Sequence, residues 1–214
     1  MNQAVAIVAA SAVFIAVLAV CEWFSRRFKL DSELARKIAH ISSGVLAACL
    51  PLVMTLYSAA IVAALFIPFM LISRSIGLFP SVHRAEPSSL GEIYFPLGVM
   101  AAALFAPSAA AYSYGVLVMG LSDAFASLAG TRYGKRSYRL PGAHKTYLGS
   151  AVFLATTLVL AFGTLAALGR LSARTILAAC LVSLALTVTE GFLGKGLDNA
   201  ALPVAGALLF QLIY

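Results

Sequence analysis

Residues 4–24 read AVAIVAASAVFIAVLAVCEWF, an apolar run with one charged side chain, Glu22, close to its end. The hydrocarbon core of a bilayer is about 30 Å thick, and an α-helix needs roughly 20 apolar residues to cross it. The run therefore predicts a transmembrane helix. No basic residue precedes it and no small-residue cleavage site follows it, so we expect a retained helix instead of a signal peptide.

The rest of the chain has the same apolar character. Of its 214 residues, 62% are hydrophobic and 11% are charged, whereas soluble domains are roughly 45–50% apolar and about 25% charged. We predict an all-α transmembrane bundle of about eight spans that forms one integral-membrane domain over residues 1–214. The predicted spans are 4–24, 38–56, 58–72, 91–106, 110–130, 147–167, 174–193 and 199–214.

Basic residues are distributed unevenly among the loops that eight spans create. Thirteen of the fifteen lie in alternate loops, and only Arg170 and Arg174 lie in the others. The positive-inside rule places the basic loops in the cytoplasm and both termini on the other side. Topology thus accounts for the net charge of +7, and we expect no nucleic-acid partner. The thirteen are Arg26, Arg27, Lys29, Arg36, Lys37, Arg74, Arg84, Arg132, Lys135, Arg136, Arg139, Lys145 and Lys195.

All eight acidic residues fall in or near the same, cytoplasmic half of the predicted bundle. Acidic residues contribute little to membrane topology, so they need not follow the basic ones. Their position predicts one charged site that faces the cytosol, at the plasma membrane if the chain is bacterial. The eight are Glu22, Asp31, Glu33, Glu86, Glu92, Asp123, Glu190 and Asp198.

The three cysteines, Cys21, Cys49 and Cys180, lie far apart in apolar runs. Their number is odd, and their spacing does not fit a metal site. We expect all three to be small core residues.

Asp123 is the acidic residue that lies deepest in a predicted span. It is seven residues from the end of span 110–130, about 10 Å below the interface at about 1.5 Å per residue. A charge at such a depth costs about 2.5–3.5 kcal/mol, so it should face the bundle interior and have a partner, most naturally a cation. A purely structural pair with a neighbouring basic or hydroxyl side chain, such as Ser127, is the simpler alternative to a catalytic role.

The loop after this span combines glycines with basic and hydroxyl residues, in GTRYGK (130–135) and HKTYLGS (144–150). Glycines let backbone N–H groups approach an anion, and the side chains add charge and donors. The pattern is not a Walker A loop, because one residue is missing between the glycines and it follows a helix. A polyphosphate site or a plain basic loop explains it. The candidate nucleotide contacts are Gly130, Arg132, Gly134, Lys135, Lys145, Thr146, Gly149 and Ser150.

In this stretch the chain resembles the polyprenol kinase family, which includes dolichol kinases, phytol kinases and CTP-dependent diacylglycerol kinases. The resemblance extends to ARKIAHISSG (35–44), GEIYFPLG (91–98) and TEGFLGKGLDNAALP (189–203). His144 departs from the pattern, since many members have a second lysine there. The matching motif is an aspartate, small residues, a Gly-x-x-x-Gly pair and Lys-Thr-x-x-Gly-Ser, here Asp123, Ala126, Gly130, Gly134, Lys145, Thr146, Gly149 and Ser150.

The resemblance implies transfer of the γ-phosphoryl group of CTP, with Mg²⁺ or another divalent cation, to the hydroxyl of a membrane lipid. Polyprenol, phytol-type alcohols and diacylglycerol all remain possible acceptors. Phosphoryl transfer requires aligned oxygens and neutralised phosphate charge, and carboxylate and amide oxygens suit Mg²⁺. Interfacial or helix-capping roles are the alternatives for these oxygens. The candidate metal ligands are Asp123, Glu92, Glu190, Asp198 and Asn199.

Arg36, Lys37 and His40 lie three and four residues apart, on one face of a predicted helix. Arg36 and Lys37 are candidate phosphate contacts, and His40 could accept the proton of the substrate hydroxyl near pH 7. Basic residues that snorkel to the interface, with a packed histidine, are the alternative. The candidate catalytic residues are thus Asp123, as metal ligand or base, Lys145, as phosphate contact, and His40.

Two other functions compete with the kinase. A CTP-using cytidylyltransferase or a phosphoalcohol transferase is one, but the CDP-alcohol transferases cluster several aspartates, and here aspartate occurs only at 31, 123 and 198. A small transporter could also have broken helices and a midplane charge. Against it, the charges lie at one face and no inverted repeat is visible.

Overall fold

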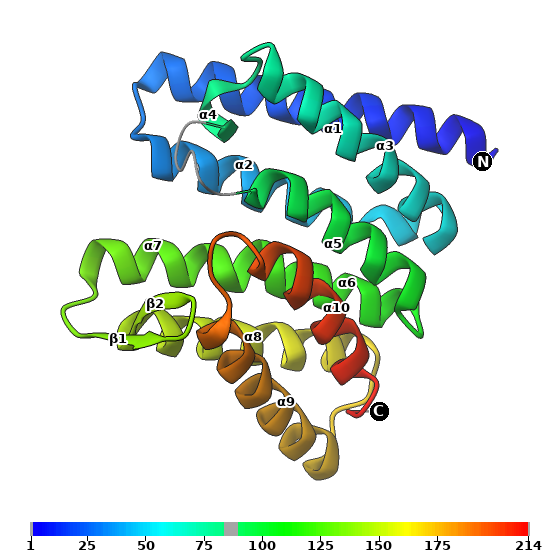
Figure 1. Ribbon diagram of the computed structural model, residues 1–214. Coiled ribbons are helices and arrows are strands. Elements are labelled where there is room, and N and C mark those ends of the chain that lie inside the picture. Colours follow the sequence, from blue (N-terminus) through cyan, green and yellow to red (C-terminus); the bar gives the residue numbers. More distant parts are fainter. Residues whose placement is uncertain (1, 84–89, 214) are drawn as a thin grey trace.

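The computed structural model describes residues 2–83 and 90–213, and helices dominate it (Figure 1). Among these residues, five helical segments are long and apolar enough to cross a membrane. The predicted all-α membrane class is therefore confirmed. The five are α1 (Gln3–Phe28), α3 (Leu56–Ser75), the continuous segment Ala109–Tyr133, α8 (Tyr147–Ala167) and α9 (Ala173–Phe192).

Three shorter helices coincide with the other predicted spans: α2 (Ser32–Ala48), α5 (Gly91–Phe105) and α10 (Asp198–Phe210). The bounds predicted for the second span, 38–56, are wrong. Its helix begins six residues earlier, because Asp31 caps it by accepting a hydrogen bond from Leu34 N, and it ends before Pro51. The count of eight spans and the position of the termini stay predictions.

The remaining elements are short. A one-turn helix, α4 (Pro80–His83), follows α3, and a 3₁₀ turn, η1 (Leu50–Leu52), follows α2. Arg84 and Glu86, counted among the cytoplasmic charges, lie outside the described residues. The segment Ala109–Tyr133 consists of α6 (Ala109–Leu117), a π-helical stretch η2 (Val118–Asp123) and α7 (Ala124–Tyr133).

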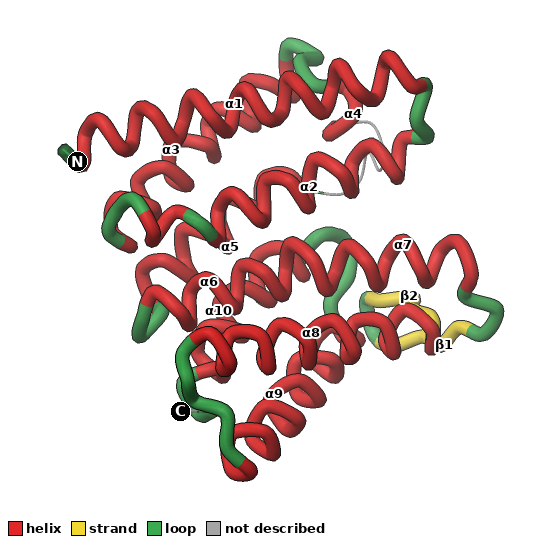
Figure 2. Tube along the Cα trace, turned by 180° about the vertical axis from the view of Figure 1, so that it is seen from behind, coloured by secondary structure: helices red, strands yellow, loops and turns green. Residues whose placement is uncertain are grey.

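The helices are stacked in layers, visible from both sides in Figures 1 and 2. Helices α1 and α3 form one outer layer, and α2 and α5 lie beneath them. The segment α6–η2–α7 and α10 follow, and α8 and α9 complete the opposite side. Consecutive long helices run in alternate directions, so their ends gather at two opposite ends of the bundle.

Two pairs of glycines allow helices to touch through their backbones. A Cβ atom on Gly44 of α2 would lie 2.7 Å from Cα of Gly120 in η2. A Cβ atom on Gly206 of α10 would lie 2.8 Å from Cα of Gly115 in α6. Small residues are typical of such close contacts in membrane bundles. The first pair holds α2 against η2, and it thereby helps to set the distance between Lys37, two turns before Gly44, and Asp123, three residues after Gly120.

The loop predicted between the fifth and sixth spans contains a β-hairpin. Strands β1 (Ser137–Leu140) and β2 (Ala143–Thr146) pair antiparallel, with Ser137 opposite Thr146. Gly142 makes the turn with a φ of 84°, a backbone conformation that glycine adopts without strain. The hairpin packs at the charged end, against α7 and α8 (Figure 2).

The prediction of three core cysteines is correct for one and wrong for two. Cys21 is buried, whereas Cys49 and Cys180 are exposed on the outside of the bundle. In a membrane protein the outer surface of a helix can be as apolar as its core, so an apolar run does not reveal which side faces inward.

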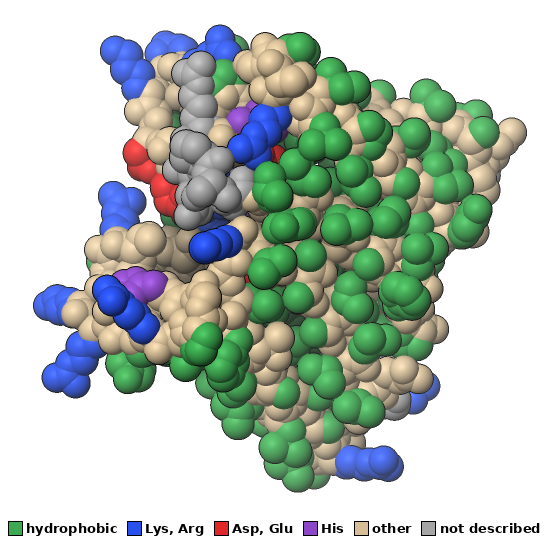
Figure 3. All heavy atoms as spheres, viewed as in Figure 1, with side chains coloured by type: hydrophobic (Ala, Val, Ile, Leu, Met, Phe, Trp, Pro, Cys, Tyr) green, Lys and Arg blue, Asp and Glu red, His purple; other side chains and the backbone are tan. Residues whose placement is uncertain are grey.

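The charged side chains are concentrated at one end of the molecule. In Figure 3, most Lys and Arg side chains lie at the end that carries the hairpin, and hydrophobic side chains cover the adjoining face. This distribution agrees with the predicted grouping of basic loops. It also makes the topology testable.

We expect cysteines placed at Ser137 and Ala109 to be labelled from opposite sides of the membrane, because they lie at opposite ends of the bundle. The measurement is labelling by a membrane-impermeant maleimide in sealed vesicles of both orientations. The background variant must lack Cys21, Cys49 and Cys180, since two of these are exposed. Labelling of both positions from the same side would contradict the eight-span arrangement.

Candidate active site

A polar cavity of about 510 Å³ lies at the charged end of the bundle, between α2, η2, α7, the hairpin and the loop before α10. Its walls combine residues from both halves of the chain. The predicted site residues that line it are Arg36, Lys37, Asp123, Gly130, Lys145, Thr146, Gly149, Ser150, Glu190, Asp198 and Asn199.

A buried ion pair forms one wall of the polar cavity. Lys37 Nζ donates to Asp123 Oδ2 over 2.9 Å, and the side chains are only 4% and 7% exposed. The prediction that Asp123 faces the interior and has a cation partner is confirmed. Ser127, the alternative partner, instead donates to Glu33 Oε1 over 3.1 Å. Because burying two charges is costly, such a pair contributes little net stability.

Asp123 is the last residue of the π-helical stretch η2. Single π-helical turns within α-helices occur frequently at functional sites. The residues before this stretch pack on α10 and α2, and those after it pack on α8. Sequence reasoning missed η2, because the stretch Val118–Asp123 contains no residue that distinguishes a π turn from an α turn.

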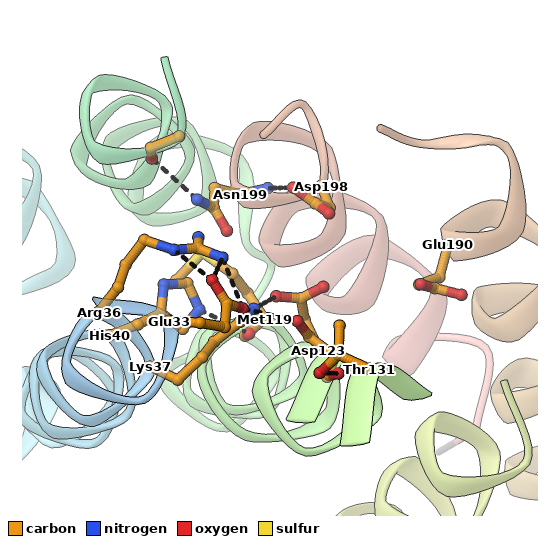
Figure 4. A network of polar contacts seen from close by, with 12 residues as sticks. Glu33, Arg36, Lys37, His40, Met119, Asp123, Thr131, Glu190, Asp198 and Asn199 are labelled. Carbon is orange, nitrogen blue, oxygen red and sulfur yellow. Dashed lines mark hydrogen bonds and ion pairs between the residues drawn. The ribbon is translucent and has the colours of Figure 1, made fainter. Parts of the chain in front are cut away.

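A second group of charges lies across the polar cavity from Asp123 (Figure 4). Lys145 donates to Glu190 Oε1, and its Nζ lies 3.9 Å from Asp198 Oδ2. Burial disfavours the ammonium ion, but the two carboxylates outweigh this effect and raise the pKa of Lys145 above its ordinary value. Lys145 is therefore positively charged at neutral pH.

The carboxylates of the polar cavity fit a divalent cation. Glu190 Oε2 is buried and has no hydrogen-bond partner among the described residues, so this oxygen is available to bind a cation. Within the described part of the chain, no three His, Cys, Asp or Glu side chains form a complete metal site. Mg²⁺ does not need such a group of three side chains, because it usually binds one or two carboxylates together with water and substrate phosphates.

Asn199 and Glu92 have other contacts. Asn199 Nδ2 donates to the carbonyl of Gly91 over 2.8 Å, which ties the start of α10 to the start of α5. Glu92 does not line the polar cavity; it pairs with Arg74 over 2.7 Å and lies 3.5 Å from His83 Nδ1. The structure thus does not bring Glu92 into the group formed by the other predicted metal ligands.

Several predicted nucleotide contacts have a packing role. A Cβ atom on Gly130 would lie 2.6 Å from Thr146 Oγ1, so this glycine lets α7 approach the start of α8. Thr146 caps α8 by accepting a hydrogen bond from Gly149 N over 3.0 Å. Arg132, Gly134 and Lys135 do not line the polar cavity.

The rim of the polar cavity contains glycines that sequence reasoning did not select. Gly142 in the hairpin turn meets Gly194 in the loop before α10, where a Cβ atom on Gly194 would collide with the Gly142 carbonyl oxygen. Gly196, on the same rim, has a φ of 86°. The three glycines in the segment GFLGKGLD (191–198) were the available signal.

His40 lies beside the polar cavity and faces a second one. Its Nε2 is 3.1 Å from the carbonyl oxygen of Met119, which can only accept, so Nε2 carries a proton and Nδ1 is the acceptor of the neutral ring. The second cavity, of about 80 Å³, is mostly apolar. Arg36 and Asn199 line both cavities. Figure 4 shows Arg36, Lys37 and His40 extending from α2 toward Asp123 and Asn199.

The chain is similar to one curated protein of known activity. It is 25% identical to a phytol kinase of Synechocystis sp. over 198 residues, which are 91% of this chain and 85% of the relative. No family model matches the chain, and no solved structure is similar to it. The similarity to the phytol kinase supports the membership of this chain in the polyprenol and phytol kinase family.

Proposed function

We propose that this chain is an integral membrane kinase that transfers the γ-phosphoryl group of CTP to the hydroxyl of a membrane lipid alcohol. One observation carries the proposal: the buried Lys37–Asp123 pair shares a polar cavity with Lys145, Glu190 and Asp198, at the charged end of a transmembrane bundle. Phosphoryl transfer needs cations for the phosphates and oxygens for a metal, and this cavity holds both. The choice of CTP follows the family resemblance.

Each side chain has a role in this proposal. Lys145 and Arg36 neutralise phosphate charge, and Lys37 holds the Asp123 carboxylate in one orientation. The second oxygen of Asp123 accepts the proton of the acceptor hydroxyl, as the oxygen–phosphorus bond forms and the bond from the γ-phosphorus to the bridging oxygen breaks. CDP leaves. Glu190 and Asp198 would hold Mg²⁺, which neutralises further phosphate charge when it is bound.

The test uses purified protein, several lipid alcohols and CTP labelled at either the γ- or the α-phosphorus. We expect the γ-label to enter the lipid and the α-label to stay in the nucleotide, and we expect EDTA to stop the reaction. ATP replaces CTP in a parallel arm, and boiled protein is the control.

The two labels separate the competing functions. Lipid that carries the α-label would indicate cytidylyl transfer in place of phosphoryl transfer. A transporter should label no lipid. Absence of labelled lipid with phytol, a polyprenol and diacylglycerol would contradict the proposal.

A further inference from the structure

The second cavity runs along one face of α2, between α1, α3 and α5. On α2 its lining residues are Arg36, Ala39, His40, Ser43 and Ala47, a spacing of three and four that follows a single helix face. Arg36 and Ala47 are eleven residues apart, which is about 16 Å along the axis at about 1.5 Å per residue. With a volume of about 80 Å³, the cavity is therefore long and narrow.

The two ends of this narrow cavity differ in polarity. Its polar end, formed by Arg36, His40, Glu92 and Asn199, lies at the charged end of the bundle. Beyond Ser43 on α2 the walls are apolar and include Leu50 and Val62. Because Arg36 and Asn199 also line the polar cavity, the two cavities adjoin at these residues.

We infer that the narrow cavity holds the hydrocarbon chain of the acceptor, with its hydroxyl between Arg36 and Asn199. This inference rests on the proposed function. The cavity is one slot with one polar end, so it fits an alcohol with a single chain, such as a prenyl or phytyl alcohol. Diacylglycerol carries two chains and two ester groups beside its hydroxyl, which need a wider site than a cavity of about 80 Å³ along one helix face.

Photolabelling locates the chain directly. The probe is a single-chain alcohol with a diazirine near the middle of its chain, applied to the full-length protein in nanodiscs. We expect cross-links within residues 39–50 and 62–70 that excess phytol suppresses. Competed cross-links confined to α8 and α9 would overturn the inference, since neither helix lines the narrow cavity.

Two matched substitutions on α3 test the same site by kinetics. Ala63 is buried and lines the narrow cavity, whereas Leu65 is 53% exposed on the outside of the helix. We expect Ala63→Phe to lower kcat/KM for a single-chain alcohol about tenfold or more, because a pocket that is off by even one methylene discriminates that strongly. The dependence on CTP should not change, and Leu65→Phe should behave like the wild type.

A third variant covers the case in which Ala63→Phe does not fold. Phe66→Ala widens the narrow cavity, and it should allow diacylglycerol to compete with the single-chain alcohol. Equal use of the alcohol by wild type and Ala63→Phe, or a wild-type preference for diacylglycerol, would overturn the inference while leaving the kinase proposal intact. If wild type phosphorylates no alcohol, the proposed function fails, and photolabelling still reports whether the slot binds a chain.

Discussion

Replacing Asp123 by asparagine is expected to abolish lipid phosphorylation, with a loss in kcat of at least about 10²- to 10³-fold, the range for removing one electrostatic group of an active site. Asparagine keeps the volume of the side chain but removes the charge that a metal or a proton needs. The measurement is transfer of the γ-label to the alcohol at saturating CTP and lipid. Activity within about threefold of the wild type, a loss of less than about 1 kcal/mol in transition-state stabilisation, would remove Asp123 from the site.

The ion pair with Lys37 complicates this substitution. The Asp123→Asn variant leaves a buried ammonium ion without its counterion, and breaking a buried pair in this way typically costs about 3–5 kcal/mol. The double variant Lys37→Met/Asp123→Asn removes both charges and should recover most of the thermal stability in detergent. It should remain inactive. Recovery of activity together with stability would show that the pair is structural.

Lys145→Ala is expected to impair the use of CTP much more than the use of the alcohol. Its ammonium ion lies between Glu190 and Asp198, on the wall of the polar cavity, and a fixed cation stabilises phosphate charge but has no attraction for a hydrocarbon chain. We expect kcat/KM for CTP to fall about 10²-fold or more, as for the loss of other electrostatic groups of active sites. Steady-state kinetics that vary CTP and lipid separately check this.

Arg139 provides the matched control, because it is exposed on the same hairpin and does not line the polar cavity. Arg139→Ala should leave both kinetic constants close to those of the wild type. Lys145→Arg should recover part of the activity, since a planar guanidinium cannot reproduce a compact point charge. An unchanged dependence on CTP with a raised requirement for lipid would place Lys145 at the lipid entrance.

The class of the fold, and most of the predicted candidates that line the polar cavity, could be predicted because they depend on local composition. A long apolar run, or an aspartate inside one, has the same physical consequence in any fold. The partner of Asp123 could not be predicted, because Lys37 is 86 residues away and is brought to it by the packing of α2 on η2, which includes the contact of Gly44 with Gly120.

Two further features, the contacts of Glu92 and the hairpin, could not be predicted for similar reasons. Glu92 belongs to the charged end, as predicted, but its position on α5 turns it toward Arg74 and away from the polar cavity. The sequence predicts only a loop where the hairpin lies, at residues 137–146, since its strands have four residues each. Strands so short depend on packing against the neighbouring helices more than on intrinsic preference.

The π-helical stretch η2 changes the direction in which the following side chains point from the helix that carries Asp123. One extra residue in a turn rotates everything after it by about 100°, the angle between successive residues of an α-helix with 3.6 residues per turn. The first half of this helix, α6, can therefore pack its small residues against α10, while the second half, α7, packs its small residues against α8. In an unbroken α-helix the packing face of α6 and that of α7 would have one fixed rotation relative to each other, and Asp123 would point in a different direction relative to α6. The extra residue lets the half that anchors the helix and the half that carries the chemistry each keep its own orientation.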